Sequence, residues 1–359
     1  MLTAPAREWE FTVPTLSRGG SLEERPCQPL RRALHLAERS RCPKARWLDR
    51  LAPYFGRRSP VVFVNVGANK GYAVASILQR FTGVNLTNTD WLTALSGFQE
   101  KKTQSVRASQ RKRSSRQTKI EKMLHTPCGA CRACHESPSR LADAMASTRK
   151  VDVHAFELLD ANVEWLRWAF QHFQVPGVVR QAIVSNETGW ADAPVRMPLG
   201  SEFVTPLAQA AHVSSRHKWL VGSLPKLRLD SYMRDVGMTH AHLVSIDTEG
   251  YDALVLEGMR GALERHAVDV VEFEYHNKSF WESTNPEARS LDSTLAWLHA
   301  ISYACFWQGD NGCLAPASGR CWDQQFEIRS WSNLVCARDG EPQKELWALA
   351  GDTGCGTIL

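Results

Sequence analysis

The chain has 359 residues, 43% of them hydrophobic, so it can bury the core of one large domain or of two ordinary ones. Its formal net charge is +5, but residues 83–150 hold 13 Lys and Arg against 5 Asp and Glu, a local charge of +8, and the rest carries −3. This distribution excludes a uniformly basic nucleic-acid-binding protein, and we do not expect nucleic acid as a partner. No stretch reaches the roughly 18 consecutive apolar residues that a membrane-spanning helix needs.

The compartment and the oligomeric state are not indicated by composition alone. The first residues lack the basic start and apolar run of a signal peptide, so the cytoplasm is the default expectation. Ten cysteines and three glycosylation sequons, at Asn85, Asn186 and Asn277, favour the secretory pathway as the alternative.

The order of apolar segments divides the chain. Residues 1–60 are rich in Pro and Arg, and we interpret them as an N-terminal arm. Apolar strands and amphipathic helices alternate over residues 61–338, and this alternation predicts a doubly wound, mostly parallel α/β sheet. The basic, cysteine-containing residues 83–150 interrupt the pattern as an insertion, and residues 339–359 are expected to form a C-terminal tail.

The first strand runs into a glycine turn. The segment "VVFVNVGANKGYAVASILQRF", residues 61–81, predicts a strand, a tight turn and a helix. Gly67 and Gly71 allow a sharp turn and the close approach of a ligand, while Asn65 and Asn69 can add hydrogen bonds. The free N–H groups of the following helix suit a carboxylate or a phosphate. A purely structural turn fits this segment equally well.

The second strand, "VHAFEL", ends in an acid. Glu157 lies where the ribose hydroxyls of a nucleoside cofactor need an acceptor, which dinucleotide folds provide about 20 residues after the glycines. Removing the insertion from the 86-residue gap between Gly71 and Glu157 restores an ordinary distance. The alternative is a solvated acid at the end of a strand.

Two more acids follow a later strand. The segment "HLVSIDTEG" delivers Asp247 and Glu249 into a turn at Gly250. Ligands of open α/β sheets bind beyond the carboxyl ends of the strands, where such acids can position a substrate hydroxyl or accept its proton.

Five segments carry a family resemblance and cover roughly residues 61–275: "VNVGANKGY", "VHAFELLDANVEWLRW", "QAIVSNETG", "LRLDSYMRDVG" and "VSIDTEGYDALVLEGMRGALE". In this order they resemble the FkbM family of S-adenosylmethionine-dependent methyltransferases. The resemblance implies a class I methyltransferase fold, which is Rossmann-like, with a seven-stranded sheet ending in an antiparallel hairpin. We expect the segments "YACFWQG" and "QQFEIRSWSNLVCAR" to form that hairpin.

The resemblance also implies a reaction and a site. The cofactor would be S-adenosyl-L-methionine, and the methyl group would pass to an oxygen of a glycan or a small metabolite. The cofactor-binding residues would be Asn65, Gly67, Asn69, Gly71, Glu157 and Ala182, the last beside the adenine.

Two positions depart from the family pattern. The family usually has Asp where this chain has Asn65, and often Lys where it has Ser245. An amide can still hydrogen-bond the cofactor, but it places no negative charge there.

The catalytic candidates lie at the ends of two strands. Asp247 and Glu249 would position the acceptor, and Glu274 or His276, from "VEFEYHNK", could take its proton. His276 titrates nearest to neutral pH and is the most natural base, although a surface histidine fits the pattern as well. We therefore place His276 among the catalytic candidates and leave the general base open.

The insertion contains a cysteine cluster, "TPCGACRACHESP", with Cys128, Cys131, Cys134 and His135 within eight residues. This spacing suits zinc, but a knuckle usually draws its ligands from two separate pairs, so disulfides with the other cysteines are an equal alternative. The preceding basic run predicts a solvated loop or a contact with an anionic polymer.

Two further functions compete with methyl transfer. One is a catalytically inactive methyltransferase fold that uses the basic insertion to contact an anionic partner, which the departures at Asn65 and Ser245 favour. The other is a nicotinamide-dependent oxidoreductase, which the missing G-x-G-x-x-G spacing disfavours.

Overall fold

The structure is a computed structural model of the chain. It describes residues 27–41, 43–82, 86–109, 150–197, 199–201, 221–281 and 289–352. Most of the insertion, including the cysteine cluster, lies outside these residues. Beside three short 3₁₀ turns, the elements in chain order are α1 (Leu30–Glu38), α2 (Arg46–Phe55), β1 (Val61–Val66), α3 (Tyr72–Phe81), α4 (Asn88–Ser109), β3 (Val151–Glu157), α7 (Asp160–His172), β4 (Gly177–Gln181), β5 (Ile183–Val184), β6 (Gly189–Pro194), β7 (Val221–Leu227), α9 (Leu229–Asp235), β8 (Ala241–Ile246), α10 (Asp252–Gly258), α11 (Arg260–Glu264), β9 (Val268–Tyr275), α12 (Leu291–Ala300), β10 (Tyr303–Gln308), β11 (Leu314–Pro316), β12 (Ser332–Arg338) and α13 (Glu341–Ala350).

A large sheet forms the centre of the molecule. Its strand order is β11-β10-β12-β9-β8-β1-β3-β4. The neighbouring strands β4, β3, β1, β8 and β9 pair in parallel. Strand β12 runs antiparallel to both β9 and β10. The described sheet has eight strands, one more than expected, because the short β11 extends its edge beside β10. A second, three-stranded sheet has the order β5-β7-β6.

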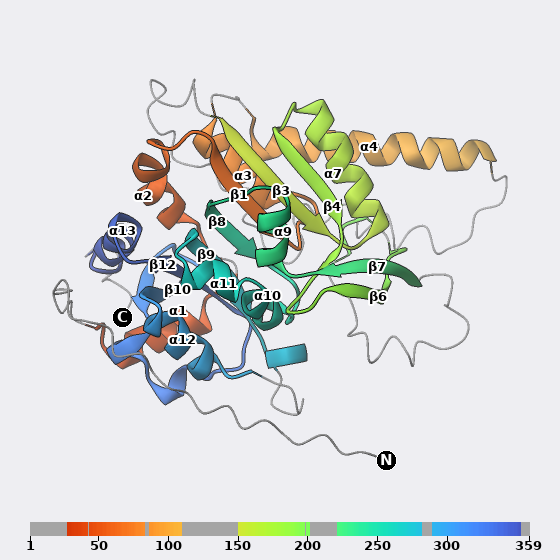
Figure 1. Ribbon diagram of the computed structural model, residues 1–359. Helices are drawn as coiled ribbons and strands as arrows, with labels where there is room; N and C mark the ends of the chain where they lie inside the picture. The colour runs from red at the N-terminus through yellow and green to blue at the C-terminus, as the bar shows by residue number, and fades with distance from the viewer. Residues whose placement is uncertain are drawn as a thin grey trace, which may run out of the picture.

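Helices cover both faces of the large sheet (Figure 1). Because successive side chains of a strand point to opposite faces, each strand feeds two cores. One core joins α1, α9, α10, α11 and α12 to strand residues such as Val64 and Val244. The other joins α2, α3, α4, α7 and α13 to residues such as Phe63 and Leu243. The fold is therefore a three-layer α/β/α arrangement.

Four helices extend this arrangement beyond the boundaries that the sequence suggested. Helices α1 and α2, from the expected arm, bury Leu36 and Leu51 against the sheet. Helix α4 begins inside the expected insertion and buries Trp91 and Leu95. Helix α13, from the expected tail, buries Leu346. The packed core thus includes parts of the expected arm, insertion and tail.

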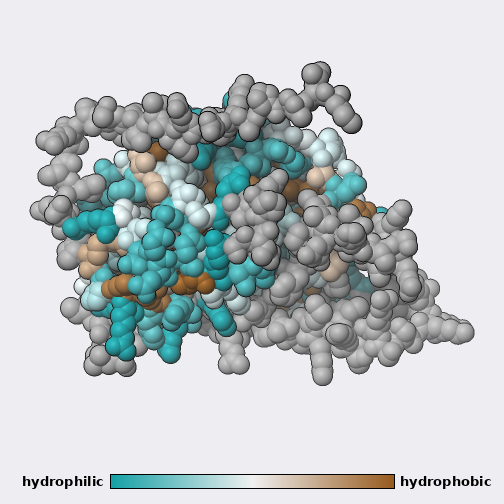
Figure 2. All heavy atoms as spheres, turned by 90° about the horizontal axis from the view of Figure 1, so that it is seen from below, coloured by the Kyte–Doolittle hydropathy of each residue, from teal (hydrophilic) through white to brown (hydrophobic). Residues whose placement is uncertain are grey.

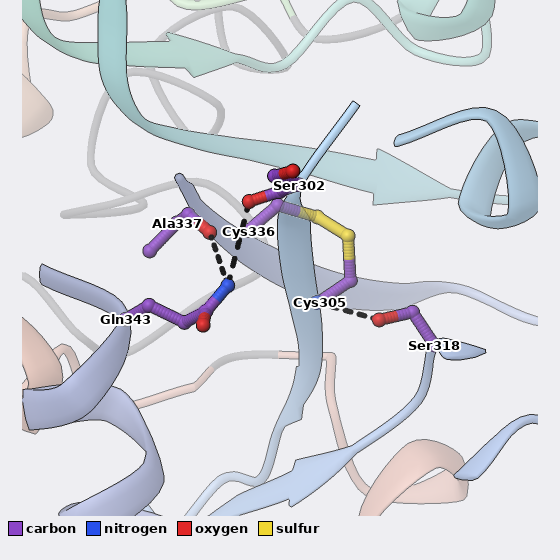
Figure 3. Close-up of a disulfide and its surroundings, with 6 residues drawn as sticks. All are labelled: Ser302, Cys305, Ser318, Cys336, Ala337 and Gln343. Carbon is purple, nitrogen blue, oxygen red and sulfur yellow. Dashed lines mark hydrogen bonds between the residues drawn. A yellow bond between two sulfur atoms is a disulfide. The ribbon is translucent and has the colours of Figure 1, made fainter. Parts of the chain in front are cut away.

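Two disulfides tie the carboxyl-terminal part of the chain together. Cys305 and Cys336 face each other in the pairing of β10 with β12. Figure 3 shows this bond beside Gln343, which donates to two backbone carbonyls. The second bond joins Cys27 to Cys321 across 294 residues of sequence, so the amino-terminal segment is fastened to the far end of the fold. Among the described cysteines none is free.

The described surface seen from below in Figure 2 is mainly hydrophilic, with hydrophobic residues in small groups. Within the described ranges, no helix combines the length and the apolar character needed to cross a bilayer.

Candidate functional site

The strand order creates a natural binding position. The chain proceeds from β1 outward to β3 and β4, and then returns to the other side of β1 with β8 and β9. Such a reversal leaves a crevice at the carboxyl ends of the two strands on either side of it. A cavity of about 490 Å³ occurs at this position, and it is lined by residues of β1, β8, β9 and the turns that follow β1 and β3.

The two turns at the crevice touch each other at Gly67. This residue has φ of +80°, and a Cβ added to it would lie 1.8 Å from the carbonyl oxygen of Asp247. Its N–H donates to the carbonyl of Phe156, and the N–H of Asp247 donates to the carbonyl of Val66. Only glycine fits this close approach.

Gly71, the second glycine of the turn, lies in a packing contact rather than on the cavity lining. Its φ is +79°, but a Cβ there would lie 2.7 Å from the side chains of Trp91 and Leu166. These side chains belong to α4 and α7, and Gly71 does not line the cavity. Its place in the structure is a packing contact between the glycine turn and two helices.

Glu157 holds the glycine turn in place. Its Oε2 accepts the N–H of Asn69 at 2.7 Å, while Oε1 accepts the N–H groups of Leu158 and Leu159 at 2.9 and 2.8 Å. Burial raises the pKa of this carboxyl, and the hydrogen bonds oppose that shift. Glu157, only 6% exposed, lines the cavity together with Asn69 and Ala182. The structure thus joins residues that 88 positions separate.

Asn65 lies deeper in the same cavity. Its side chain is 2% exposed, and its Oδ1 has no hydrogen-bond partner among the described residues. On the neighbouring strands Asn65 pairs with Ser245, and Ser245 pairs with Glu272, so the three form one row across β1, β8 and β9. All three line the cavity.

On the other side of the crevice lies a pair of side chains suited to proton transfer. His276 Nε2 and Glu274 Oε2 are 2.8 Å apart, and the other oxygen of Glu274 accepts the indole N–H of Trp331 at 2.8 Å. The rings of His276 and Trp331 are stacked, with centroids 6.1 Å apart. His276 is 3% exposed and lines the cavity, so it is not a surface histidine.

The two acids after β8 lie at the same cavity but in different surroundings. Asp247 is exposed at its wall. Glu249, half-buried, accepts a hydrogen bond from Lys278 Nζ at 3.0 Å. Burial raises the pKa of Glu249, and the contact with Lys278 opposes that shift. Asp247, Glu249 and His276 therefore line one cavity.

A fully buried acid, Asp252, accepts hydrogen bonds from the backbone beside these residues. Asp252, at the start of α10, accepts the N–H groups of Gly250 and Glu274 at 3.1 and 3.3 Å, and that of Thr248 at 3.5 Å. Burial, with a smaller contribution from the nearby charge of Glu274, raises the pKa of Asp252 to about 7. Asp252 thereby connects the turn after β8 to the end of β9.

The raised pKa of Asp252 gives a testable pH dependence. A carboxyl whose pKa is higher in the folded than in the unfolded protein favours folding below its ordinary pKa and loses that contribution as the pH rises toward about 7. We expect the free energy of unfolding of the native protein, minus that of Asp252→Asn, to fall between about pH 4 and pH 7 by at most about 1.4 kcal/mol per pH unit. Urea denaturation at several pH values measures it. A difference that stays constant over this range would contradict the assignment.

Several cavity residues were not identified from the sequence. Glu272 and Gln308 border its inner end, and Lys278 and Trp331 border the side of His276. Lys278 follows the motif "VEFEYHN" directly, so its position near a strand end is a signal that could have found it. Trp331 comes from a segment more than fifty residues away, and no short motif connects it with Glu274.

The metal ligands expected in the insertion, Cys128, Cys131, Cys134 and His135, lie outside the described residues. Within the described part of the chain, His240, His242 and Asp269 are close enough to share an ion. Two of these three already have other partners: Asp269 accepts from Arg338 at 2.6 Å, and His242 Nδ1 accepts the N–H of Val62. The group therefore fits a hydrogen-bonded ion pair better than a metal site.

Comparison with known proteins identifies part of this site. Residues 222–303 match the family model of the methyltransferase FkbM domain, which includes β8, β9 and the side chains from Asp247 to His276. No curated protein matches the chain, and no solved structure matches it. The resemblance to the FkbM methyltransferases is thus confirmed over these residues.

Proposed function

Residues 222–303 carry a methyltransferase FkbM domain, and from this premise we propose that the chain transfers a methyl group from S-adenosylmethionine to a hydroxyl of a glycan or small metabolite. One observation carries the proposal. The cavity at the switch point of the sheet joins the glycine turn and Glu157 on one side to the pair of Glu274 and His276 on the other.

The residues on the side of β1 and β3 fit the cofactor. Gly67 has no side chain, so the turns after β1 and β8 meet through backbone atoms alone. The buried Oδ1 of Asn65 has no donor among the described residues and can accept one from a ligand. We assign Glu157 to the ribose hydroxyls and Ala182 to the adenine, as the resemblance implies. When bound, S-adenosylmethionine supplies an already activated methyl group.

The residues on the other side fit an acceptor. Methyl transfer to an alcohol releases a proton, and a histidine hydrogen-bonded to a carboxylate is suited to take it. We propose that His276 accepts this proton and that Glu274 orients its ring and stabilises the resulting charge. Asp247 and Glu249 would position the acceptor, and the other residues that line the cavity would exclude water.

The disulfides bear on where the chain works. Bonds such as Cys27–Cys321 and Cys305–Cys336 persist in oxidising compartments. They support the secretory pathway over the cytoplasm, and a glycan over a cytosolic metabolite as the acceptor.

The proposal is tested by following a labelled methyl group. Purified protein is incubated with methyl-labelled S-adenosylmethionine and a panel of glycans and small alcohols, and the product is identified by mass spectrometry. We expect an O-methyl ether that the Glu157→Ala variant does not form. Label found only on nitrogen or carbon would contradict transfer to oxygen.

A further inference from the structure

The inner end of the cavity contains a carboxylate, Glu272, to which the proposed reaction gives no role. It lies between the sheet and the helices α2 and α3, beneath Leu48 and Ile77. Phe63 and Leu243, which pair on β1 and β8, provide an apolar wall. Asn65, Ser245 and Glu272 follow on the same face of the sheet, since every second residue of a strand points to one side.

Glu272 has hydrogen-bond donors but no cation. Ser245 and Gln308 hydrogen-bond to its carboxylate, and Gln308 is itself fixed by the indole N–H of Trp47 at 2.7 Å. No Lys, Arg or His among the described residues forms an ion pair with Glu272. The charge of Arg80 acts on it, but the guanidinium of Arg80 is ion-paired with Asp49 at 2.7 Å. A carboxylate in such a place is costly unless a positive group joins it.

The acids around it differ in this respect. Glu249 is paired with Lys278, and Glu274 with His276. On this side of the cavity, Glu272 thus differs from Glu249 and Glu274, because no cationic side chain among the described residues pairs with it. Burial raises the pKa of Glu272, and its hydrogen bonds and Arg80 oppose that shift. A cation beside it would favour the ionised form.

A second atom points to the same kind of ligand. Asn65 borders the cavity, and its buried Oδ1 accepts no hydrogen bond from a described residue. A buried acceptor without a donor costs about 1–3 kcal/mol, so a ligand that brings an N–H or O–H group here is favoured. Asn65 and Glu272 lie two strands apart, about 10 Å at the backbone. Between them stands only the short side chain of Ser245.

We propose that this inner end is a binding site for a protonated amine, with Glu272 as its anion and Asn65 Oδ1 as an additional acceptor. An ammonium group matches both because it offers a positive charge and three donors. The apolar wall suits the carbon chain that carries it. Two sources share this chemistry: the amino-acid part of the cofactor, in which case the inference rests on the proposed function, and an amine-bearing acceptor.

The test compares Glu272→Gln with the native protein and with Glu187→Gln, an exposed glutamate paired with Lys226 outside the cavity. Calorimetry measures the affinity for S-adenosylmethionine and for 5′-methylthioadenosine, which lacks the amino acid. Thermal unfolding in n-butylamine and in n-butanol measures protection by an amine and by its neutral analogue.

If the cofactor is the source, Glu272→Gln lowers the affinity for S-adenosylmethionine at least tenfold and leaves the affinity for methylthioadenosine unchanged. If an acceptor is the source, butylamine raises the Tm of the native protein, butanol does not, and the variant loses this protection. Glu187→Gln should behave as the native protein throughout. The inference is overturned if Glu272→Gln changes neither the affinity for S-adenosylmethionine nor the protection by butylamine.

A second variant keeps the test decisive if Glu272→Gln does not fold. Ser245→Lys places a tethered ammonium beside Glu272, so it should abolish the same amine binding while the carboxylate remains. Unchanged amine binding in a folded Ser245→Lys protein would also overturn the inference. A native protein that binds no S-adenosylmethionine but is protected by butylamine would contradict the proposed function alone.

Discussion

Replacing Gly67 with Ala is expected to lower the free energy of unfolding by about 3 kcal/mol or more and to abolish cofactor binding. An L-residue at φ of +80° costs about 1–2 kcal/mol by itself. In addition, the new Cβ would overlap the carbonyl oxygen of Asp247, 1.8 Å away, so the turns after β1 and β8 must separate. Residues that we assign to the cofactor and to the acceptor lie in these turns, so the cavity would lose its shape.

Urea denaturation of Gly67→Ala beside Gly97→Ala measures this effect. Gly97 lies in helix α4, and a Cβ there meets nothing within 4 Å. Its replacement should leave stability unchanged or raise it by up to about 1 kcal/mol, since alanine favours a helix. Equal stabilities of the two variants would show that the two turns are not in the close contact described above.

The second large effect concerns His276. If it takes the proton of the acceptor, His276→Ala should lower kcat by about 10²-fold or more, while the affinity for S-adenosylmethionine stays within a few fold of the native value. Glu274→Gln should lower kcat by a smaller factor, because the ring of His276 remains but loses its charged partner, 2.8 Å away. Both are measured with the acceptor identified by the labelled methyl group.

The matched control is His172→Ala. His172 is the last residue of α7, exposed and stacked on Trp168, whereas the cavity borders the opposite end of that helix. It should leave kcat and cofactor affinity unchanged. A His276→Ala enzyme with native kcat would exclude His276 as the base and leave Asp247, Glu249 and Glu274 as the remaining candidates.

Much of the part of the cavity formed by β1 and β3 could be predicted from the sequence, because it depends on local patterns. Gly67 directly follows β1, and Glu157 is the last residue of β3. Parallel strands bring their carboxyl ends to one edge of the sheet. Although 86 residues separate Gly71 from Glu157, the structure joins the glycine turn to this acid through the hydrogen bond from the N–H of Asn69 to Glu157. The packing of Gly71 against Trp91 could not be predicted, because it depends on a helix inside the expected insertion.

The boundaries of the core were harder to read. Charge marked residues 83–150 as an insertion, but Trp91, Leu95 and Phe98 recur at helical spacing, and the structure buries all three. The same spacing in "ELWALA" brings α13 onto the sheet. In both segments a short apolar stripe determines the packing, whereas the surrounding composition suggests solvated chain.

The acceptor side depends on contacts between distant segments. Glu272 reads as an ordinary alternating residue of the strand "VEFEYH", and its importance lies in the cavity beneath α2 and in the absence of a described ion-pair partner. Trp331 reaches Glu274 because β12 runs antiparallel beside β9, a register that no short motif encodes. These features required the structure.

The measurement that tests the central claim most directly is the equilibrium binding of S-adenosylmethionine, by calorimetry, to the native protein, Glu157→Ala and Glu164→Ala. Glu164 is an exposed residue of α7 away from the cavity and serves as the control. We predict micromolar binding that Glu157→Ala weakens at least tenfold, about 1.4 kcal/mol, and that Glu164→Ala leaves unchanged. No binding by the folded native protein would contradict the enzyme and favour an inactive methyltransferase fold that acts by binding a partner.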